Sequence, residues 1–272
     1  MGGTDALAAI EFLSGESDLF TSESMMLRLS LFLLFWLPTS VCLIADDPVA
    51  DKPIAENLVE KYRASATEKW AKDMQRIKSL DASNTDPKNA ILFIGSSSIR
   101  LWEDIAADLK PWPVIQRGYG GAKFSDLAVL ADQIVRTHDF RALVIFVGND
   151  ITGGTDDKSP AEVVKLFEHV VATARRHQPQ APVFLLEITP TPKRWEAWPK
   201  IKEANAALKK ACESGENLHF IQTAGQYLDA SGNPMPELFK EDKLHQNRSG
   251  YERWSRLVLT ELERVLKSPE PK

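Results

Sequence analysis

The hydrophobic positions of this chain fall into short continuous runs, separated by longer segments in which apolar residues recur every three or four positions. Continuous runs are typical of strands buried on both faces, whereas the longer spacing is typical of amphipathic helices. The continuous runs predict five strands, at residues 91–95, 113–118, 142–148, 182–188 and 218–222.

The periodic segments predict helices that alternate with these strands. An amphipathic helix is expected over 55–77, followed by a loop at 81–89. A helix over 159–177 begins with a cap residue, Ser159, followed by Pro160 at its first position. Further helices are predicted at 98–109, 120–135, 200–213 and 250–266. Buried strands that alternate with helices predict an α/β protein, a single three-layer α/β/α domain around a parallel sheet.

The N-terminal segment differs from the rest of the chain. Arg28 precedes the apolar run LSLFLLFWL, and the apolar stretch ends at Ala45 before two aspartates. This order predicts a signal peptide at 25–45 that is cleaved near Ala45, although a retained anchor is the alternative. Residues 1–24 are acidic, so translation is expected to begin at Met25 or Met26, unless they form a real extension. The expected organisation is a leader at 1–45 and an exported domain at 46–272.

Composition narrows the choice of partners and cofactors. The chain has 33 Lys and Arg against 38 Asp and Glu, a net charge of -5, which excludes a generally basic nucleic-acid binder. Its two cysteines supply neither a disulfide framework nor a zinc-binding pair. No stable membrane insertion is expected once the leader has been removed.

Residues that could take part in catalysis follow the first three predicted strands. They are the segments Gly95-Ser96-Ser97-Ser98, Gly118-Tyr119-Gly120-Gly121 and Gly148-Asn149-Asp150. The carboxyl ends of parallel strands meet at one edge of the sheet, where such folds bind their ligands. A serine there can act as a nucleophile, and an amide can donate to an oxyanion. Each segment could equally be an ordinary turn or helix cap.

A candidate base lies near the C-terminus. Asp242 precedes His245 by three residues, so its carboxylate can accept a hydrogen bond from Nδ1 and leave Nε2 free to take a proton from a serine. Glu241 is the competing carboxylate. The other four histidines, at 138, 169, 177 and 219, are expected to be structural or solvated, and none forms a pair with metal-ligand spacing.

Taken together, the segments ILFIGSSSIRLW, QRGYGGAKFSDL, VIFVGND and EDKLHQNRSGYERW resemble the SGNH hydrolase superfamily, also called GDSL-type lipases and esterases. The resemblance implies a flavodoxin-like five-stranded sheet and a serine esterase that needs no cofactor or metal. It implies that Ser97, Asp242 and His245 form the catalytic triad, and that the Ser97 N–H, Gly121 and Asn149 form the oxyanion hole.

The chain departs from the superfamily pattern in two places. Ser96 stands where the family has Asp, and Gln116 stands where many members have Asn. The segment GSSSIRLW is similar to a branch that contains platelet-activating-factor acetylhydrolase-like enzymes and sugar O-acetyl esterases.

The substrate expectation rests on the segment after the fourth strand. Trp195, Trp198 and Arg194 are predicted to border the crevice and contact a sugar, unless the tryptophans pack beneath a loop. The favoured substrate is a short acyl ester, acetyl above all, on a carbohydrate or another small molecule. The alternatives are a lysophospholipid or platelet-activating-factor-type ester, and an inactive SGNH fold used as a binding module.

Overall fold

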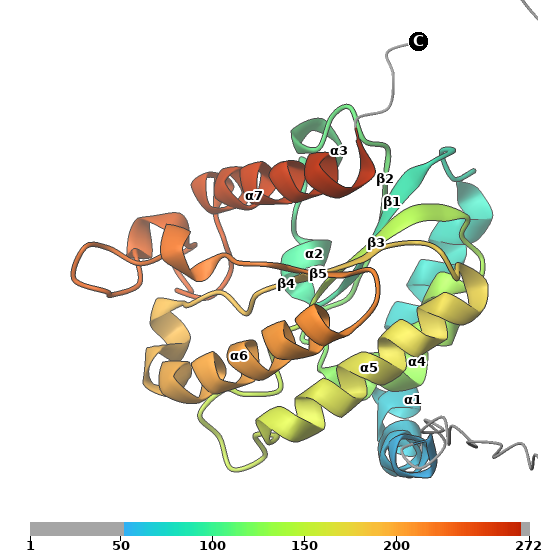
Figure 1. The fold of residues 1–272 in the computed structure, drawn as a ribbon, viewed down its shortest axis with the longest axis horizontal. Helices are drawn as coiled ribbons and strands as arrows, with labels where there is room; N and C mark the ends of the chain where they lie inside the picture. Colours follow the sequence, from blue (N-terminus) through green and yellow to red (C-terminus); the bar gives the residue numbers. More distant parts are fainter. Residues whose placement is uncertain (1–51, 268–272) are drawn as a thin grey trace, which may run out of the picture. The chain divides into compact units, whose positions relative to one another are not determined.

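The structure is a computed structural model that describes residues 52–267 (Figure 1). The predicted leader at 1–45 lies outside the described residues, as do residues 46–51 and 268–272 of the predicted domain. Within the described part, no helix is long and apolar enough to cross a membrane.

Five parallel strands form one sheet in the order β2-β1-β3-β4-β5, which confirms the predicted fold class. This is the flavodoxin-like order, in which the ligand crevice lies between β1 and β3 where the strand order reverses. The strands are β1 Ala90–Gly95, β2 Val114–Gly118, β3 Phe140–Phe146, β4 Val183–Leu186 and β5 Leu218–Ile221. Gly95 pairs with both Gly118 and Phe146, so β1, β2 and β3 end at the same level and their loops start side by side.

Helices cover both faces of the sheet. One face carries α1 Lys52–Ser83, α4 Phe124–Val135, α5 Pro160–His177 and α6 Trp198–Ser214, and the other carries α2 Ser97–Arg100, α3 Ile105–Asp108 and α7 Arg248–Leu266 (Figure 1). Successive strand residues point to opposite faces. Leu92 and Ile94 therefore join the core under α4 and α5, while Ile91 and Phe93 join the core under α7.

The helix predicted at 159–177 forms as expected. The Ser159 Oγ accepts a hydrogen bond from the Glu162 N–H at 3.2 Å, and Pro160 is the first residue of α5. The cap satisfies one of the N–H groups that a helix leaves without a partner in its first turn.

The single helix predicted at 98–109 is wrong. The chain forms two short helices there, α2 and α3, separated by residues 101–104. The side chain of Gln116 donates to the carbonyls of Ile99 at 2.6 Å and Trp102 at 3.0 Å, and the buried Trp102 indole donates to Asp108 at 2.6 Å. The two bonds from Gln116 satisfy carbonyls that a continuous helix would use. The segment contains no Gly or Pro that would predict the break.

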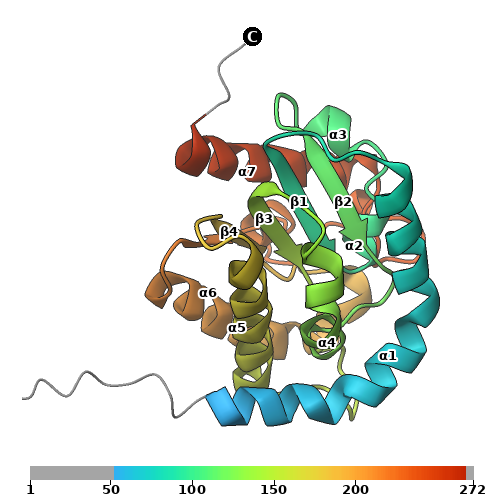
Figure 2. The same cartoon turned by 90° about the vertical axis from the view of Figure 1, so that its right-hand side faces the viewer.

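Helix α1 is longer than predicted, because it continues through Asp81 to Ser83 in the segment expected to be a loop. It packs along α4 and reaches the loop that follows β2 (Figure 2). The Trp70 ring meets the Tyr119 ring edge-on at 5.0 Å, and Arg76 Nη2 donates to the Gly118 carbonyl at 2.8 Å. Helix α1 therefore supports the glycine-rich loop at the sheet edge.

Candidate active site

The turn after β1 brings Ser97 to the sheet edge. Gly95 has a φ of +129°, and a Cβ at this position would lie 1.9 Å from the Phe146 carbonyl oxygen. Only glycine therefore fits where the end of β1 lies against the end of β3. Ser96 is buried, Ser97 is the first residue of α2, and the Tyr251 hydroxyl donates to the Ser98 carbonyl at 2.9 Å. The turn is fixed from both sides, so the position of Ser97 is fixed with it.

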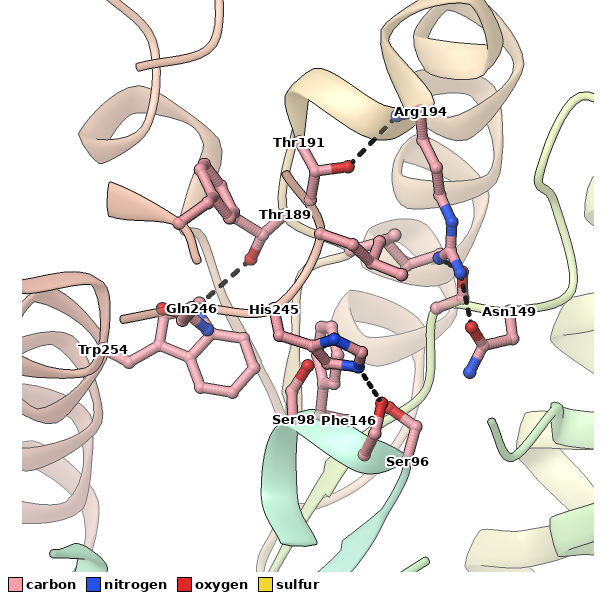
Figure 3. Close-up of a pocket in the computed structure, with 15 residues that line it drawn as sticks. Ser96, Ser98, Phe146, Asn149, Thr189, Thr191, Arg194, His245, Gln246 and Trp254 are labelled. Carbon is pink, nitrogen blue, oxygen red and sulfur yellow. Dashed lines mark hydrogen bonds between the residues drawn. The ribbon is translucent and has the colours of Figure 1, made fainter. Parts of the chain in front are cut away.

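Three predicted residues lie in one hydrogen-bonded line. Ser97 Oγ is 2.9 Å from His245 Nε2, and His245 Nδ1 is 2.5 Å from Asp242 Oδ2. Figure 3 shows the His245 ring and the dashed line that marks its hydrogen bond to the serine turn. The contacting serine is Ser97 rather than Ser96 or Ser98, and the contacting carboxylate belongs to Asp242 rather than Glu241, although both carboxylates are exposed. The carboxylate at Nδ1 holds the tautomer in which Nε2 is an acceptor toward the serine hydroxyl.

Asp242 is stabilised as a carboxylate by local hydrogen bonds. Partial burial by itself would raise the pKa of Asp242. The imidazole of His245 and the backbone N–H groups of His245 and Leu244, both at 2.9 Å from Oδ1, outweigh it and lower the pKa to about 2. Hydrogen bonds to the charged form have this effect on any carboxyl group. Asp242 therefore stays ionised and keeps its orientation at any pH near neutrality.

Neighbouring backbone segments fix the loop that carries His245. The Lys240 N–H donates to the His245 carbonyl at 2.7 Å, and the Lys193 N–H donates to the Lys243 carbonyl at 3.0 Å. Gln246, next to the histidine, is buried and accepts a hydrogen bond from the Tyr227 hydroxyl at 2.5 Å. The imidazole is therefore presented by a braced loop, even though its own side chain is partly exposed.

The two predicted oxyanion residues are neighbours. Asn149 follows β3 and faces the cavity at Ser97, and its side-chain Nδ2 donates at 2.7 Å to the carbonyl of Ala122. Ala122 directly follows Gly121, whose φ of +71° favours glycine. Gly121 itself is exposed and is not among the residues that line the cavity, so the structure brings Asn149 to the site more directly than Gly121.

A small cavity lies above Ser97 and has a volume of about 30 Å³. Its polar side is formed by the residues already named and by Thr189, Thr191 and Arg194 (Figure 3). Its apolar wall is formed by Phe146, Ile188, Phe239, Leu244 and Trp254. Phe146 ends β3 and Trp254 lies in α7, whereas the other three wall residues lie in connecting segments. No local sequence signal assigned these residues to the site.

The predicted substrate contacts divide into two groups. Arg194 lines the cavity, but its guanidinium bonds to the Gly148 carbonyl and the Asn149 side chain. Trp195 and Trp198 do not line the cavity; they stack on each other at 6.2 Å and border a separate pocket with Glu187 and Lys202. Trp198 is only 5% exposed, because it packs into the core beneath α6. The structure therefore does not bring Trp198 to the cavity, and its ring packs in the core instead.

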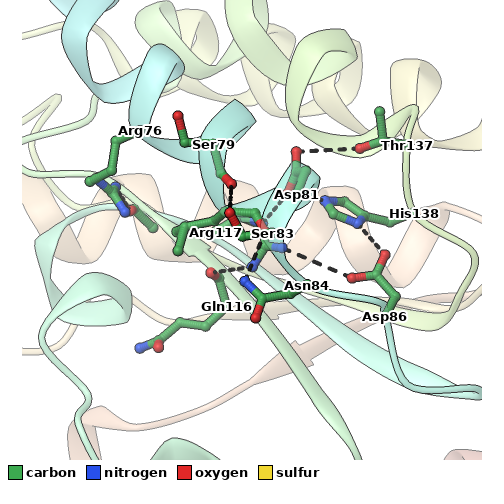
Figure 4. A network of polar contacts seen from close by, with 12 residues as sticks. Arg76, Ser79, Asp81, Ser83, Asn84, Asp86, Gln116, Arg117, Thr137 and His138 are labelled. Atoms are coloured by element: carbon green, nitrogen blue, oxygen red, sulfur yellow. Dashed lines mark hydrogen bonds and ion pairs between the residues drawn. The ribbon is translucent and has the colours of Figure 1, made fainter.

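A second polar cluster, away from the cavity, contains His138 and has the geometry of a structural cluster. His138 Nδ1 lies 2.6 Å from Asp86, and Arg117 Nε donates to Asp81 at 2.6 Å (Figure 4). This cluster ties the end of α1 to β2 and contains no nucleophile next to the ring. Across residues 52–267, no group of three or more His, Cys, Asp or Glu side chains is arranged to hold a metal ion.

Known proteins agree with this geometry at the level of family and fold. The sequence profile of the GDSL-like Lipase/Acylhydrolase family matches residues 94–253. No curated protein sequence matches the chain significantly.

Solved structures share the fold at low sequence identity. A Streptococcus pneumonia protein described as a platelet activating factor has 22% identity and a TM-score of 0.63, with 77% of this chain and 99% of that chain covered. A Bacteroides fragilis protein assigned as an acylhydrolase has 22% identity and a TM-score of 0.62, with 71% and 97% covered. A GDSL-like lipase from Bacteroides thetaiotaomicron has 19% identity and a TM-score of 0.59, with 71% and 98% covered.

The family match spans more than half of the chain, from the end of β1 into α7. It contains Ser97, Gly121, Asn149, Asp242 and His245. The chain is therefore an ester hydrolase that belongs to the GDSL-like lipase/acylhydrolase family.

Proposed function

We propose that this enzyme is a serine esterase that removes a short acyl group, acetyl above all, through a triad of Ser97, His245 and Asp242. The observation that carries the proposal is the 2.9 Å contact between Ser97 Oγ and His245 Nε2, with the Asp242 carboxylate on the opposite ring nitrogen. A hydroxyl, an imidazole and a carboxylate in this order activate a serine on unrelated folds.

The reaction takes place in two acyl transfers. His245 Nε2 takes the proton from Ser97 Oγ as that oxygen bonds to the ester carbonyl carbon. The oxyanion accepts hydrogen bonds from the Asn149 amide, the Ser97 N–H and the Gly121 N–H. His245 then gives the proton to the departing alcohol oxygen, and the carbon–oxygen bond breaks to leave an acyl-serine. Water attacks this ester with His245 as base, which releases the carboxylic acid and restores Ser97.

The size of the cavity supports a short acyl group. A cavity of roughly 10–15 Å³ holds one water molecule, so the volume of about 30 Å³ beside Ser97 suits a group with the size of an acetyl. Phe146 and Trp254 close the apolar side, and their rings meet at 4.6 Å. A longer acyl chain would have to displace these packed aromatic rings.

The alcohol side of the substrate is proposed to be polar, as in a carbohydrate. The large apolar groove of the described residues lies between α5 and α6, around Val164, Val171 and Leu218, and shares no lining residue with the cavity. Among the described residues, this apolar groove therefore does not extend the cavity at Ser97 to accommodate a lipid chain. A lysophospholipid or platelet-activating-factor-type ester is the competing substrate.

A panel of esters tests the substrate class. Hydrolysis of p-nitrophenyl acetate, butyrate and octanoate should fall steeply with chain length, because the cavity does not extend. Acetylated sugars should be turned over with a higher kcat/KM than a lysophospholipid. Faster hydrolysis of the octanoate, or of the lysophospholipid, would replace the carbohydrate proposal by the lipid one.

A covalent label tests the enzymatic proposal separately from the substrate. A serine-directed phosphonate should modify Ser97, as read by mass spectrometry of the digested protein. Ser97→Ala should remove labelling and activity, whereas Ser96→Ala and Ser98→Ala should keep much of both. Failure of the wild-type protein to react would support an inactive binding module, and labelling of Ser98 would shift the nucleophile by one residue.

We also propose that the enzyme acts outside the cytoplasm. The proposal rests on the basic and apolar pattern of residues 25–45 alone. N-terminal sequencing of the protein from its native source should find a mature end near Asp46. Recovery of residues 1–24 on the mature protein would contradict both export and the later translation start.

A further inference from the structure

The side chain of Arg194 joins the segment after β4 to the end of β3. Arg194 lies in the 3-10 helix Pro192–Ala197, whose first turn is capped by the Thr191 hydroxyl. Its guanidinium Nη1 donates to the Gly148 carbonyl, and Nη2 donates to the Asn149 Oδ1 at 2.5 Å (Figure 3). One planar cation therefore holds both the backbone and the side chain at the point where the candidate oxyanion donor leaves the strand.

These contacts determine which way the Asn149 amide faces. Oδ1 accepts from Arg194, while Nδ2 donates to the Ala122 carbonyl at 2.7 Å. A flipped amide would place two donors against each other at Arg194 and two acceptors against each other at Ala122. An unmade or repulsive hydrogen bond of this kind costs about 1–3 kcal/mol for a buried group. The amide therefore has one favoured orientation.

We infer that Arg194 is a positioning residue of the oxyanion hole, one that acts through Asn149 rather than by binding the alcohol of the substrate. The Asn149 amide has two N–H bonds, and Ala122 uses one of them. The second is left for the oxyanion that forms on the ester bonded to Ser97. The inference rests on the proposed esterase mechanism, and it gives Arg194 a different task from the sugar contact predicted from the sequence.

The charge of Arg194 adds to its geometric effect. Within residues 52–267, no carboxylate lies within 4.0 Å of its guanidinium, although the group is largely buried among protein atoms. Burial lowers the pKa of Arg194, while the more distant Asp157 and Asp150 raise it, and a guanidinium remains charged at neutral pH. A cation bonded to Oδ1 polarises the amide and strengthens its N–H bonds as donors.

A double-mutant cycle separates this role from a substrate contact. The variants are Arg194→Ala, Asn149→Ala and the double variant, measured with p-nitrophenyl acetate. Arg194→Ala should lower kcat roughly 100-fold, the loss associated with one oxyanion donor, with little change in KM. Arg194→Lys should recover only part of the activity, because an ammonium cannot bond to Gly148 and Asn149 in the same fork.

The double variant shows whether Arg194 acts through Asn149. If Arg194 acts through Asn149, the double variant should be about as slow as Asn149→Ala alone. If the two losses multiply, or if Arg194→Ala raises KM without lowering kcat, the inference is overturned. Arg176→Ala, which removes an exposed arginine on α5, is the matched control for loss of one positive charge and should leave kcat unchanged.

A second measurement does not depend on activity. In a crystal structure of Arg194→Ala, the Asn149 side chain should occupy more than one orientation, while Ser97 and His245 keep their contact. A single unchanged Asn149 orientation would overturn the inference. If wild-type protein hydrolyses no ester and takes up no phosphonate, the esterase proposal fails, but this structural comparison still shows whether Arg194 positions Asn149.

Discussion

Two histidines in this protein make nearly the same contact with an aspartate but differ in what surrounds the rest of the ring. His245 Nδ1 lies 2.5 Å from Asp242, and His138 Nδ1 lies 2.6 Å from Asp86. The other ring nitrogens differ. Nε2 of His245 faces the Ser97 hydroxyl at 2.9 Å, whereas Nε2 of His138 faces the Asp81 carboxylate at 3.5 Å without hydrogen-bond geometry.

The group at the second nitrogen decides what each pair can do. A hydroxyl can give up its proton to the ring, but an ionised carboxylate has none to give. Burial separates the pairs as well: the His138 side chain is 1% exposed, while His245 is 24% exposed beside the cavity. A histidine–aspartate pair is therefore evidence of a catalytic base only together with its third partner and an opening for substrate.

The largest effect is expected when each of the two histidines is changed to glutamine. His245→Gln should lower kcat by roughly 10⁶-fold, as loss of the base does in a serine protease triad, with the folded state preserved. His138→Gln should keep kcat and lose about 1–3 kcal/mol of unfolding free energy, because it leaves Asp86 with a poorer partner. Kinetics and urea unfolding of both variants give the answer. A large loss of kcat in His138→Gln would show that the buried pair also contributes to the reaction.

The carboxylates can be tested next. Asp242→Asn should lower kcat by up to about 10⁴-fold, because the amide no longer selects the useful tautomer of His245. Glu241→Gln, one residue away and exposed, is the matched control and should leave kcat unchanged. A smaller loss in Asp242→Asn would mean that the braced loop orients the imidazole by itself. A loss confined to Glu241→Gln would move the orienting role to Glu241.

The buried cluster should respond in stability. Arg117 is 7% exposed and pairs with Asp81 at 2.6 Å and Asp86 at 3.9 Å. Arg117→Met should cost about 3–5 kcal/mol of unfolding free energy, since it leaves two carboxylates without their buried counter-ion. Chemical unfolding measures the loss, and the phosphonate labelling rate of the remaining folded protein should stay near that of the wild type. A change below about 1 kcal/mol would show that water compensates the cluster.

Asp150 provides the smallest and most specific test, because it is buried like the Arg117 cluster but lies next to the active site. Burial raises the pKa of Asp150 to about 6, against the opposing effects of the Phe124 N–H and Lys158 at 3.8 Å. The folded protein then holds a proton that the unfolded chain releases above about pH 4. Stability should therefore fall as pH rises from about 4 to about 6, by up to about 3 kcal/mol.

Asp150→Asn removes the titrating group and should lack this part of the pH dependence. The asparagine can still accept from the Phe124 N–H, so the local fold is preserved. Urea unfolding of both proteins across this pH range is the measurement. Equal slopes in the two proteins would mean that Lys158 keeps Asp150 ionised throughout.

The sequence predicted the parts of this protein whose signal is local. Continuous apolar runs such as ALVIFVG locate the strands, because β3 is buried on both faces. The order of Ser97, Asn149 and His245 placed the candidate site at the correct sheet edge, because parallel strands bring their ends together. The break between α2 and α3 was missed because it carries no local residue signal; the hydrogen bonds made there come from Gln116, which lies 17 residues after Ile99 and 14 after Trp102.

Side-chain direction was harder to predict than position. Arg194, Trp195 and Trp198 were expected to act together, since they are close in sequence. In the structure they point to different places. Arg194, in the 3-10 helix, bonds to Asn149, whereas Trp195 borders a separate pocket and Trp198, the first residue of α6, packs into the core. The directions of these side chains depend on the packing between β4 and α6, which cannot be predicted from the spacing of the residues in the sequence.

Helix α1 limits how far this enzyme can be truncated from its N-terminal side. The family profile begins at residue 94, after the helix has ended. Nevertheless Trp70 is the nearest side chain to the open face of Gly121, Arg76 bonds to Gly118, and Val59, Ala66 and Ile77 are buried in the core. A fragment cut to the family boundaries would contain every candidate catalytic residue, but the glycine-rich loop would lose the α1 side chains that pack against it. The minimal catalytic unit of this protein therefore extends well upstream of the segment by which its relatives are recognised.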